Sequence, residues 1–348
     1  MQFVRSVTSA ALLALALVSA ACSRSSTTST EQGAGEQTEL RHQGSVGAVS
    51  FPELAEDLGY LAPTKLTYIG NTISGPQDIQ TVVTGDTDYG VAFNGAIIKL
   101  VTAKAPIRAV ISAYGIDETT WGGFYVTDDS PIHDARDLIG KKVSMNTLGA
   151  HSEFILREYL ARNGLTPEEA KKVTLVVVPP ISAEQTLRAH QVEVASLGGV
   201  LRDKALERGG IRLLFSDYQL YGSFNAGSYV FRKKFIEQNP KTVARFVDGT
   251  ARAIEWARTT PPEQVIARMT DIIRRRGRNE DASTVRYWKT TGIGSPGGVI
   301  RDRDLQLWID WLVRAGELKP GEVTPSQIST NEFNPFANST AVVSKTGP

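Results

Sequence analysis

The sequence predicts an α/β protein of two lobes joined by a two-segment hinge, and three observations support this prediction. From Glu39 onward, short β-type runs alternate with helical patterns, which is typical of mainly parallel sheets. The turn DDSP at residues 128–131 lies near the start of a second, self-contained group of such elements. Beyond Phe231 the pattern is almost continuously helical, so this tail lacks the strands of a third lobe.

The first group of elements covers residues 39–122. Helix 52–58 begins with Pro52 and ends at Gly59, and helix 76–84 ends at Gly85, which are favoured places for proline and glycine. YGVAF at 89–93 is a strand that runs directly into a helix. The other strands expected here are 45–49, 65–69 and 108–113.

The second group covers residues 123–227, which is long enough for a lobe of its own. VTLVVV at 173–178 is an apolar run of the length expected for a buried strand. The other strands expected in this group are 124–126, 142–145, 194–197 and 211–215. The expected helices are 149–163, 182–190 and one that begins at Val200.

The tail returns the chain to the first lobe. After a strand at 229–231, helices are expected at 234–238, 240–258, 262–276, 281–289 and 302–315. The first lobe then consists of residues 39–122 and 228–340, and the chain crosses between the lobes twice. Two crossings form a hinge beside a cleft, and ligands of such folds bind in the cleft.

The composition excludes several classes of function. Lys and Arg (38 residues) nearly balance Asp and Glu (37 residues), so no broad positive field attracts nucleic acid. The four histidines are scattered, and no GxSxG, HExxH or P-loop pattern is present. We therefore expect a monomer that binds a small solute, with no metal, no cofactor and no enzyme activity.

The N-terminus predicts export. The apolar run AALLALALV at 10–18 is too short to span a bilayer, and small residues separate it from Cys22, the only cysteine. This pattern predicts a signal peptide at 1–21, and it resembles the lipobox of bacterial lipoproteins, which implies a lipid anchor on Cys22. Ser19 stands where such proteins usually carry Leu, so cleavage without lipidation is the alternative. Residues 22–38 are expected to be the lipidated cysteine and a flexible tether.

Three longer segments carry a resemblance to a known family. They are SGPQDIQTVVTGDTDYGVAFNGA at 74–96, DSPIHDARDLIGKKVSMNTLGAHSEFILREYLARNGL at 129–165, and FRKKFIEQNPKTVARFVDGTARAIEWA at 231–257. The chain resembles the alkanesulfonate, taurine and nitrate-binding proteins of ABC importers, a family that includes binders of thiamine pyrimidine precursors. The resemblance implies a type II periplasmic-binding-protein fold, a membrane permease with a cytosolic ATPase as partners, and a periplasmic or cell-surface location.

Three loops each end a predicted strand and open a helix. Helix N-termini bind oxyanions through free N–H groups and the helix dipole, so an anion bridging the two lobes is expected. Capping is the other interpretation, since Ser, Asn and Thr open helices in general. The candidate ligand-binding residues in these loops are Ser74, Gly75, Gln77, Asn94, Gly95, Thr147, Gly149, His151 and Ser152.

Four further residues near predicted loops or crossings complete the candidate site: Phe51, Trp121, Gly199 and Asn225. For His151, the resemblance implies a place beside the ligand. Two other functions stay open. The first is an enzyme like the yeast-type pyrimidine synthase, although that relative relies on a cysteine-rich motif that this chain lacks. The second is a ligand-sensing module for a membrane receptor. The sequence alone does not name the solute.

Overall fold

The computed structural model describes residues 36–338. The predicted signal peptide, Cys22 and most of the predicted tether lie outside the described residues. Within residues 36–338, no helix is long and apolar enough to cross a membrane.

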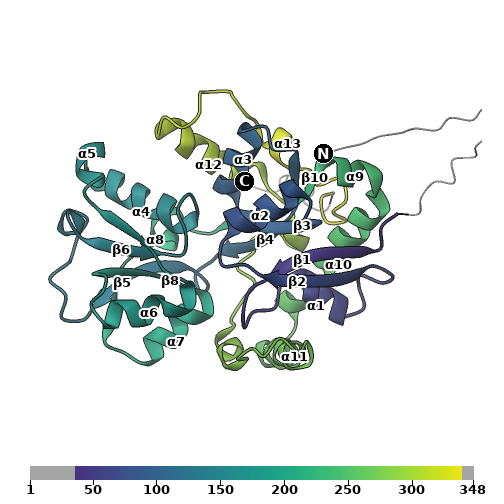
Figure 1. Cartoon of the computed structure of the whole chain (residues 1–348), viewed down its shortest axis with the longest axis horizontal. Coiled ribbons are helices and arrows are strands. Elements are labelled where there is room, and N and C mark those ends of the chain that lie inside the picture. The colour runs from purple at the N-terminus through teal and green to yellow at the C-terminus, as the bar shows by residue number, and fades with distance from the viewer. Residues whose placement is uncertain (1–35, 339–348) are drawn as a thin grey trace, which may run out of the picture. The chain divides into compact units, whose positions relative to one another are not determined.

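The second lobe is built on one five-stranded sheet. Its strands are β5 (Gly122–Thr127), β6 (Lys142–Met145), β7 (Thr174–Val177), β8 (Val194–Gly198) and β9 (Ile211–Ser216), and they lie in the order β7-β6-β8-β5-β9. β6 is parallel to β7 and β8, whereas β5 is antiparallel to both of its neighbours. The helices are α4 (His151–Arg162), α5 (Pro167–Ala170), α6 (Pro180–Arg188), α7 (Gly199–Glu207) and α8 (Asp217–Tyr221), with a short 3-10 helix at Arg136–Leu138. One face of the sheet carries α4 and α8, and the other carries α6 and α7 (Figure 1).

The first lobe also has five strands, and they come from both of the chain segments that form this lobe. These are β1 (Glu39–Gly44), β2 (Lys65–Asn71), β3 (Tyr89–Phe93), β4 (Ile107–Ile116) and β10 (Phe224–Arg232). β1 and β2 form a parallel pair, and β10 lies between β3 and β4, antiparallel to both. The N–H of Asp88 donates to the carbonyl of Arg41, which places β1 beside β3. In each lobe, the strand that follows a crossing is the antiparallel one.

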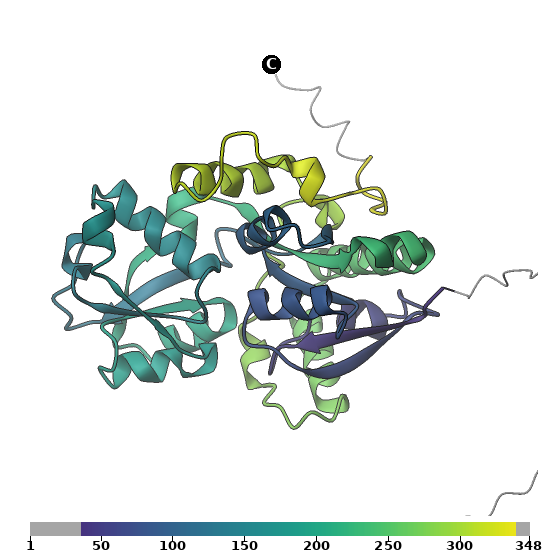
Figure 2. The ribbon, with the colours of Figure 1, turned by 45° about the horizontal axis from the view of Figure 1, so that its top comes forward.

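The C-terminal helices pack on the first lobe, as predicted. α10 (Pro240–Thr259) packs against α1 (Phe51–Asp57), and α12 (Asp302–Arg314) packs against α3 (Asn94–Thr102) (Figure 2). The remaining helices of this lobe are α2 (Gly75–Thr84), α9 (Lys233–Gln238), α11 (Pro262–Arg275) and α13 (Pro325–Ile328), with 3-10 turns at Ser283–Tyr287 and Pro296–Gly298.

The predicted tether is too long by three residues. The carboxylate of Glu36 accepts hydrogen bonds from the N–H groups of Lys241 and Thr242, and the N–H of Gln37 donates to Asn239 Oδ1 at 2.7 Å. These bonds place a negative charge at the N-terminus of α10, where the helix dipole stabilises it. Residues 36–38 therefore belong to the folded lobe.

Three predicted elements and one boundary need correction. Residues 45–49 form a turn around Gly47, and the first strand is Glu39–Gly44. The run at 173–178 forms an edge strand that pairs only with β6, and Val177 is 52% exposed, so it is not a buried strand. The helix expected at 281–289 shrinks to the 3-10 turn Ser283–Tyr287. The boundary expected at 227/228 falls inside β10, which pairs with β4 from Phe224 onward.

Aromatic side chains join the hydrophobic cores of the two lobes. Phe154 of α4 stacks on Trp311 of α12 with 4.2 Å between ring centroids, and its ring edge meets Phe93 of β3 at 5.1 Å. Phe93 also meets the fully buried Trp308 at 4.6 Å. Since burying an aromatic side chain contributes several kcal/mol, this contact holds α4 firmly against the first lobe.

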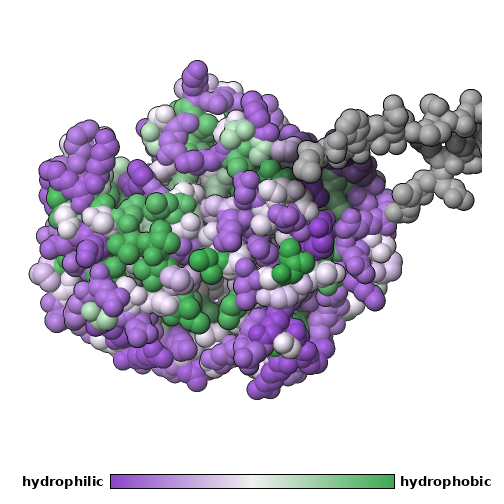
Figure 3. Space-filling view, in the orientation of Figure 1, coloured by the Kyte–Doolittle hydropathy of each residue, from purple (hydrophilic) through white to green (hydrophobic). Residues whose placement is uncertain are grey.

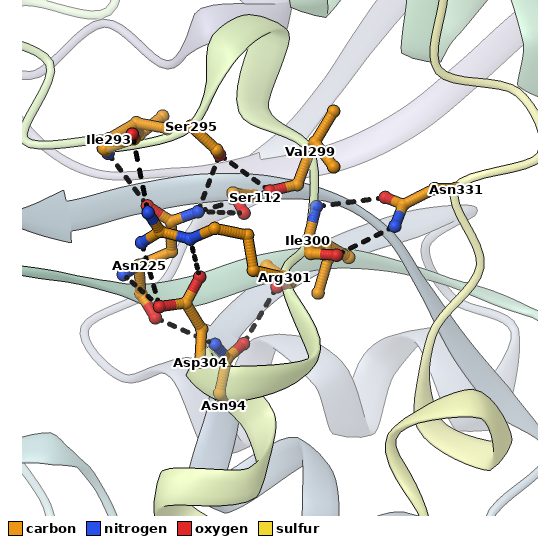
Figure 4. Close-up of polar contacts among 12 residues, drawn as sticks. Asn94, Ser112, Asn225, Ile293, Ser295, Val299, Ile300, Arg301, Asp304 and Asn331 are labelled. Carbon is orange, nitrogen blue, oxygen red and sulfur yellow. Dashed lines mark hydrogen bonds and ion pairs between the residues drawn. The ribbon is translucent and has the colours of Figure 1, made fainter. Parts of the chain in front are cut away.

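A hub of buried amides joins β10 to the C-terminal segment (Figure 4). Asn225 donates through Nδ2 to Ser112 Oγ and Ser295 Oγ, at 3.1 and 2.8 Å, and its Oδ1 accepts from the N–H of Gly294 at 2.9 Å. Its backbone carbonyl accepts from Asn94 Nδ2 at 3.1 Å. Both asparagines are completely buried, so this network replaces the hydrogen bonds that they would make with water.

Asn225→Ala is expected to destabilise the protein by about 2–4 kcal/mol, because it leaves the buried partners of the amide without hydrogen bonds. Urea unfolding followed by circular dichroism measures this change. Gln191→Ala, at an exposed position, is the control and should change stability by less than about 0.5 kcal/mol. Equal stabilities of the two variants would contradict the importance of the hub.

Candidate functional site

A cavity of about 390 Å³ lies where the two lobes meet. The first lobe contributes Tyr114, Gly115 and Ile116 from the end of β4, together with Thr291 from the C-terminal tail. Thr120 and Trp121 come from the first crossing between the lobes, and the second lobe contributes the rest of the wall, mostly from the carboxyl ends of its strands and the helices that follow them. Both crossings of the chain pass beside this cavity, as expected for ligand sites in folds of this class.

Helix N-termini supply much of the polar wall. α4, α6, α7 and α8 all begin at the cavity, where His151, Pro180, Gly199 and Asp217 are their first residues. The residues that precede α4 and α7 are Ala150 and Gly198, and neither makes a side-chain cap. Uncapped N-terminal N–H groups and the helix dipole favour negative charge, so these two termini provide anion-binding groups.

The remaining wall is largely apolar. Trp121, Ile155, Leu197 and Leu201 line it. The guanidinium of Arg202 lies over the Trp121 ring, 4.1 Å from its centroid, and donates to the carbonyl of Trp121 at 2.9 Å. Arg202 is 2% exposed, so it holds Trp121 in place from behind the wall.

Exposed apolar side chains continue from this wall on the second lobe. Leu148 and Ile181 follow the neighbouring strands β6 and β7, and they are 51% and 70% exposed. Figure 3 shows hydrophobic residues gathered on this lobe, while hydrophilic residues cover most of the margin of the same face. No Lys or Arg lies among the residues that line the cavity. A solute with an apolar body therefore fits this site better than a bare inorganic ion.

Two titratable groups face each other in the cavity: Asp217 is buried, and the His151 side chain is 20% exposed although its Nε2 atom is buried. His151 Nε2 lies 3.3 Å from Asp217 Oδ2. The imidazole stacks on Phe93 at 5.0 Å with nearly parallel rings, and Phe224 and Trp308 lie at its edge. Burial among these rings lowers the pKa of His151 to about 4. His151 is therefore a neutral imidazole at neutral pH.

Asp217 has the opposite shift. Burial raises the pKa of its carboxyl to about 7, although hydrogen bonds from the N–H groups of Gly122 and Tyr218 and the charge of Arg202 act to lower it. The separation from His151 is within ion-pair range, but burial disfavours the charged form of both groups. Between about pH 4 and pH 7 we therefore assign a neutral pair, a carboxylic acid beside a neutral imidazole.

Four of the predicted site residues line the cavity: Trp121, His151, Ser152 and Gly199. Ser152 Oγ lies 2.8 Å from Ser196 Oγ, which also lines the wall, so two hydroxyls from neighbouring elements are available together. The other predicted residues do not line the cavity; they are Phe51, Ser74, Gly75, Gln77, Asn94, Gly95, Thr147, Gly149 and Asn225.

Packing and capping account for the residues around α2 and α1. Ser74 caps α2 by accepting from the N–H of Gln77, which is the alternative left open by the sequence. A Cβ on Gly75 would lie 2.9 Å from the Cα of Ala92, so this glycine lets α2 approach β3. Phe51 is packed in the core of the first lobe.

The residues around α3 and α4 are also used within the protein. Asn94 and Asn225 belong to the buried amide hub, and a Cβ on Gly95 would collide with the rings of Phe93 and Phe154. The N–H of Gly149 donates to Glu153 Oε2 at 2.7 Å. Thr147 makes only a long contact of 3.5 Å with the carbonyl of Leu148.

The sequence did not single out several residues of the cavity wall, in particular Asp217, Ser196, Leu201 and Asn146. Asp217 directly follows a predicted strand and opens a helix, so the same pattern that selected Asn94 also applied to it. Leu201 looks in sequence like any apolar residue of an amphipathic helix. Within residues 36–338, no group of three or more His, Cys, Asp or Glu is arranged to hold a metal ion.

Known proteins share this architecture. The family model described as NMT1/THI5 like matches residues 54–264. A protein of Brucella abortus (strain 2308) that is named as a binding protein is 23% identical over 195 residues, which cover 56% of this chain and 57% of that protein. The match thus spans less than two thirds of the relative's length.

Solved structures share the fold over both lobes. The alkanesulfonate-binding protein SsuA from Xanthomonas axonopodis pv. citri, bound to MOPS, has a TM-score of 0.65 at 19% identity, covering 85% of this chain and 99% of that one. The periplasmic nitrate-binding protein NrtA from Synechocystis PCC 6803 has a TM-score of 0.65 at 15% identity, covering 90% of each chain. The desulfurization enzyme DSZB has a TM-score of 0.57 at 16% identity, covering 88% of this chain and 100% of that one. The fold expected from the resemblance is confirmed.

The two cavity groups should affect stability with opposite dependence on pH. The folded-state pKa of Asp217 is raised, so its stabilising contribution is complete near pH 4 and is lost as pH rises to about 7. The folded-state pKa of His151 is lowered, so its contribution is present above about pH 6.5 and is lost as pH falls toward 4. Between pH 4 and 7, Asp217→Asn should gain stability relative to wild type as pH rises, and His151→Gln should lose it.

Thermal unfolding of both variants at half-unit pH steps from 4.5 to 8 measures these trends. His133→Gln, at an exposed position, is the control and should run parallel to wild type. Parallel curves for all three variants would contradict the assigned protonation states.

Proposed function

The chain belongs to the NMT1/THI5-like family, and from that premise we propose that it is the solute-binding component of an ABC import system. It captures a small organic anion or polar solute, such as a sulfonate, in the cavity between its lobes and delivers it to a membrane permease with a cytosolic ATPase. Taurine belongs to the same general class, and nitrate, which the family resemblance also implies, is the less favoured alternative. The protein binds its solute and does not transform it.

One observation carries this proposal: the cavity combines helix N-termini with an apolar wall and holds no cationic side chain. The termini of α4 and α7 accept an oxyanion without a neutralising Lys or Arg, because N–H groups in fixed positions replace its hydration shell. Trp121 and Leu201 pack against the apolar body of the solute. The volume suits a molecule with a small ring or a short chain.

The binding proteins of similar fold support the proposal by their named ligands. SsuA is an alkanesulfonate-binding protein that was solved with MOPS, and NrtA is a nitrate-binding protein. DSZB shows that an enzyme uses the same fold. The only cysteine of the present chain is Cys22, which precedes the lobes, so a cavity thiol is not available as a nucleophile.

A panel of solutes tests this function directly. Thermal unfolding is measured with taurine, MOPS, benzenesulfonate, benzoate, nitrate and an aminopyrimidine, since a ligand that binds the native state raises the unfolding temperature. We expect at least one organic anion to raise it, and mass spectrometry should recover that compound unchanged. An unfolding temperature that no member changes would contradict solute binding, and a new product would favour an enzyme.

Leu201→Glu should weaken binding of the anion found in that panel by about tenfold or more, because it places a negative charge on the cavity wall. Leu206→Glu is the matched control on the same helix, since Leu206 is 40% exposed and does not line the cavity. Isothermal titration calorimetry compares the two variants with wild type. Equal losses in both would show that the cavity is not the binding site.

We also propose that the protein is exported and tethered to a membrane through a lipid on Cys22. Cys22→Ser should then move the protein from the membrane fraction to the soluble extracytoplasmic fraction, because the variant lacks the thiol that receives the lipid. Cell fractionation followed by immunoblotting measures this. A wild-type protein found wholly in the soluble fraction would contradict the anchor and favour cleavage alone.

A further inference from the structure

His151 and Asp217 lie in a geometry that requires a proton between them. Nε2 of His151 is completely buried and has no well-aligned hydrogen-bond partner among the described residues, although Oδ2 of Asp217 is only 3.3 Å away. A neutral imidazole that carries its hydrogen on Nδ1 presents a lone pair at Nε2, and a carboxylate presents lone pairs only. Two buried acceptors at this distance repel each other, whereas one proton turns the same contact into a hydrogen bond. When the carboxyl loses its proton, the imidazole can carry its own hydrogen on Nε2 instead, which keeps the contact but leaves the pair with a negative charge.

The net charge of the pair depends mainly on whether this proton is bound, because the groups around the pair are already paired or stay neutral. Arg202 of α7 is the cation whose charge acts on Asp217, but it is already paired with Asp203 at 2.7 Å and donates to the carbonyls of Thr119 and Trp121. Tyr114 of β4 and Tyr125 of β5 also face Asp217, and burial raises the pKa of both phenols, so they stay neutral.

On the other side, aromatic rings pack against His151, and they carry no charge. They come from Phe93 of β3, Phe224 of β10 and Trp308 of α12. When the pair loses its proton, a negative charge therefore appears inside the cavity, close to the N-termini of α4 and α8.

We propose that Asp217 and His151 form a specificity-determining pair: they share one titratable proton in addition to the imidazole's own hydrogen, and the cavity accepts an anionic solute only while that proton is bound. This inference rests on the proposed function, because it concerns the same cavity. The proton leaves to bulk water when the pair deprotonates, and the remaining carboxylate then repels an anion in a site of low dielectric constant. A neutral solute that donates a hydrogen bond escapes this repulsion.

The expected size of the effect follows from the raised pKa of Asp217, about 7. At pH 6 the pair is mostly protonated, and at pH 8 only about a tenth of the molecules retain the proton. The apparent affinity for an anion falls in proportion to the competent fraction, so it should be about tenfold weaker at pH 8 than at pH 6. Asp217→Asn keeps a neutral side chain of the same shape at every pH and should abolish this dependence.

The first test needs no solute. Nitrogen-15 NMR of the histidine side chains is recorded from pH 5 to 9 in wild type, in Asp217→Asn, and in His151→Gln, which identifies the His151 signals by their absence. In wild type, His151 should remain a neutral imidazole above pH 5, and its nitrogen signals should shift with a midpoint near pH 7 as the shared proton leaves. This step should be absent in Asp217→Asn. An imidazolium that forms with the ordinary midpoint near 6.5, or a step that persists in the variant, would overturn the shared proton.

The second test uses benzenesulfonate as the probe. Calorimetry at pH 6 and pH 8 should give about tenfold weaker binding at pH 8 in wild type and equal affinities in Asp217→Asn. Equal wild-type affinities at both pH values would refute the role of the pair while leaving solute binding intact. Absence of binding at both pH values, together with a panel that finds no other ligand, would contradict the proposed function, and the NMR titration would still decide whether the proton is shared.

Discussion

The packing of α4 on the first lobe is the contact on which the rest of the site depends. Phe154 and His151 lie one turn apart on this helix, so they occupy the same face. Phe154 is held by Phe93 and Trp311, and His151 stacks on the same Phe93. The hydrophobic contact between the lobes thereby fixes the position of the His151 imidazole in the cavity, and it excludes water from one side of that ring.

This shared core changes how the two lobes relate to each other. A pair of lobes with separate cores would be connected by the two crossings alone, but here buried residues of β3, α4 and α12 form one cluster. On the other side of the cavity, α7 meets the first lobe through polar contacts, which include the ion pair of Asp203 with Lys289 at 3.0 Å. Such partly exposed ion pairs contribute far less than buried aromatic rings. The side at α7 is therefore the weaker of the two connections.

The wall of the cavity carries no cationic side chain, so its positive potential comes from backbone groups. Helix N-termini provide partial positive charge, and burial keeps the carboxyl of Asp217 neutral below about pH 7. The apolar wall around Trp121 lowers the local dielectric constant and strengthens both effects.

The sequence by itself determined the fold class, the return of the helical tail to the first lobe and most of the elements. Strands 89–93 and 142–145 were predicted with the bounds that the structure shows, and Gly85 ends α2 as expected. These features depend on local rules, namely the period of apolar residues and the backbone freedom of glycine. Trp121, His151, Ser152 and Gly199 were also among the predicted site residues, and they line the cavity; their contact with a ligand stays a prediction.

Only the tertiary structure decided which of the similar helix starts face the cavity. Asn94 and Asp217 both open helices directly after strands. The side chain of Asn94 is hydrogen-bonded within the buried hub to Asn225, whereas Asp217 lines the wall of the cavity. The difference arises from partners that are distant in the chain. Asn94 bonds to residue 225, whereas Asp217 lies beside His151 of α4 and accepts from the N–H of Gly122 in β5. Local patterns contain no information about such partners, because burial and hydrogen bonding are set by which elements the fold brings together.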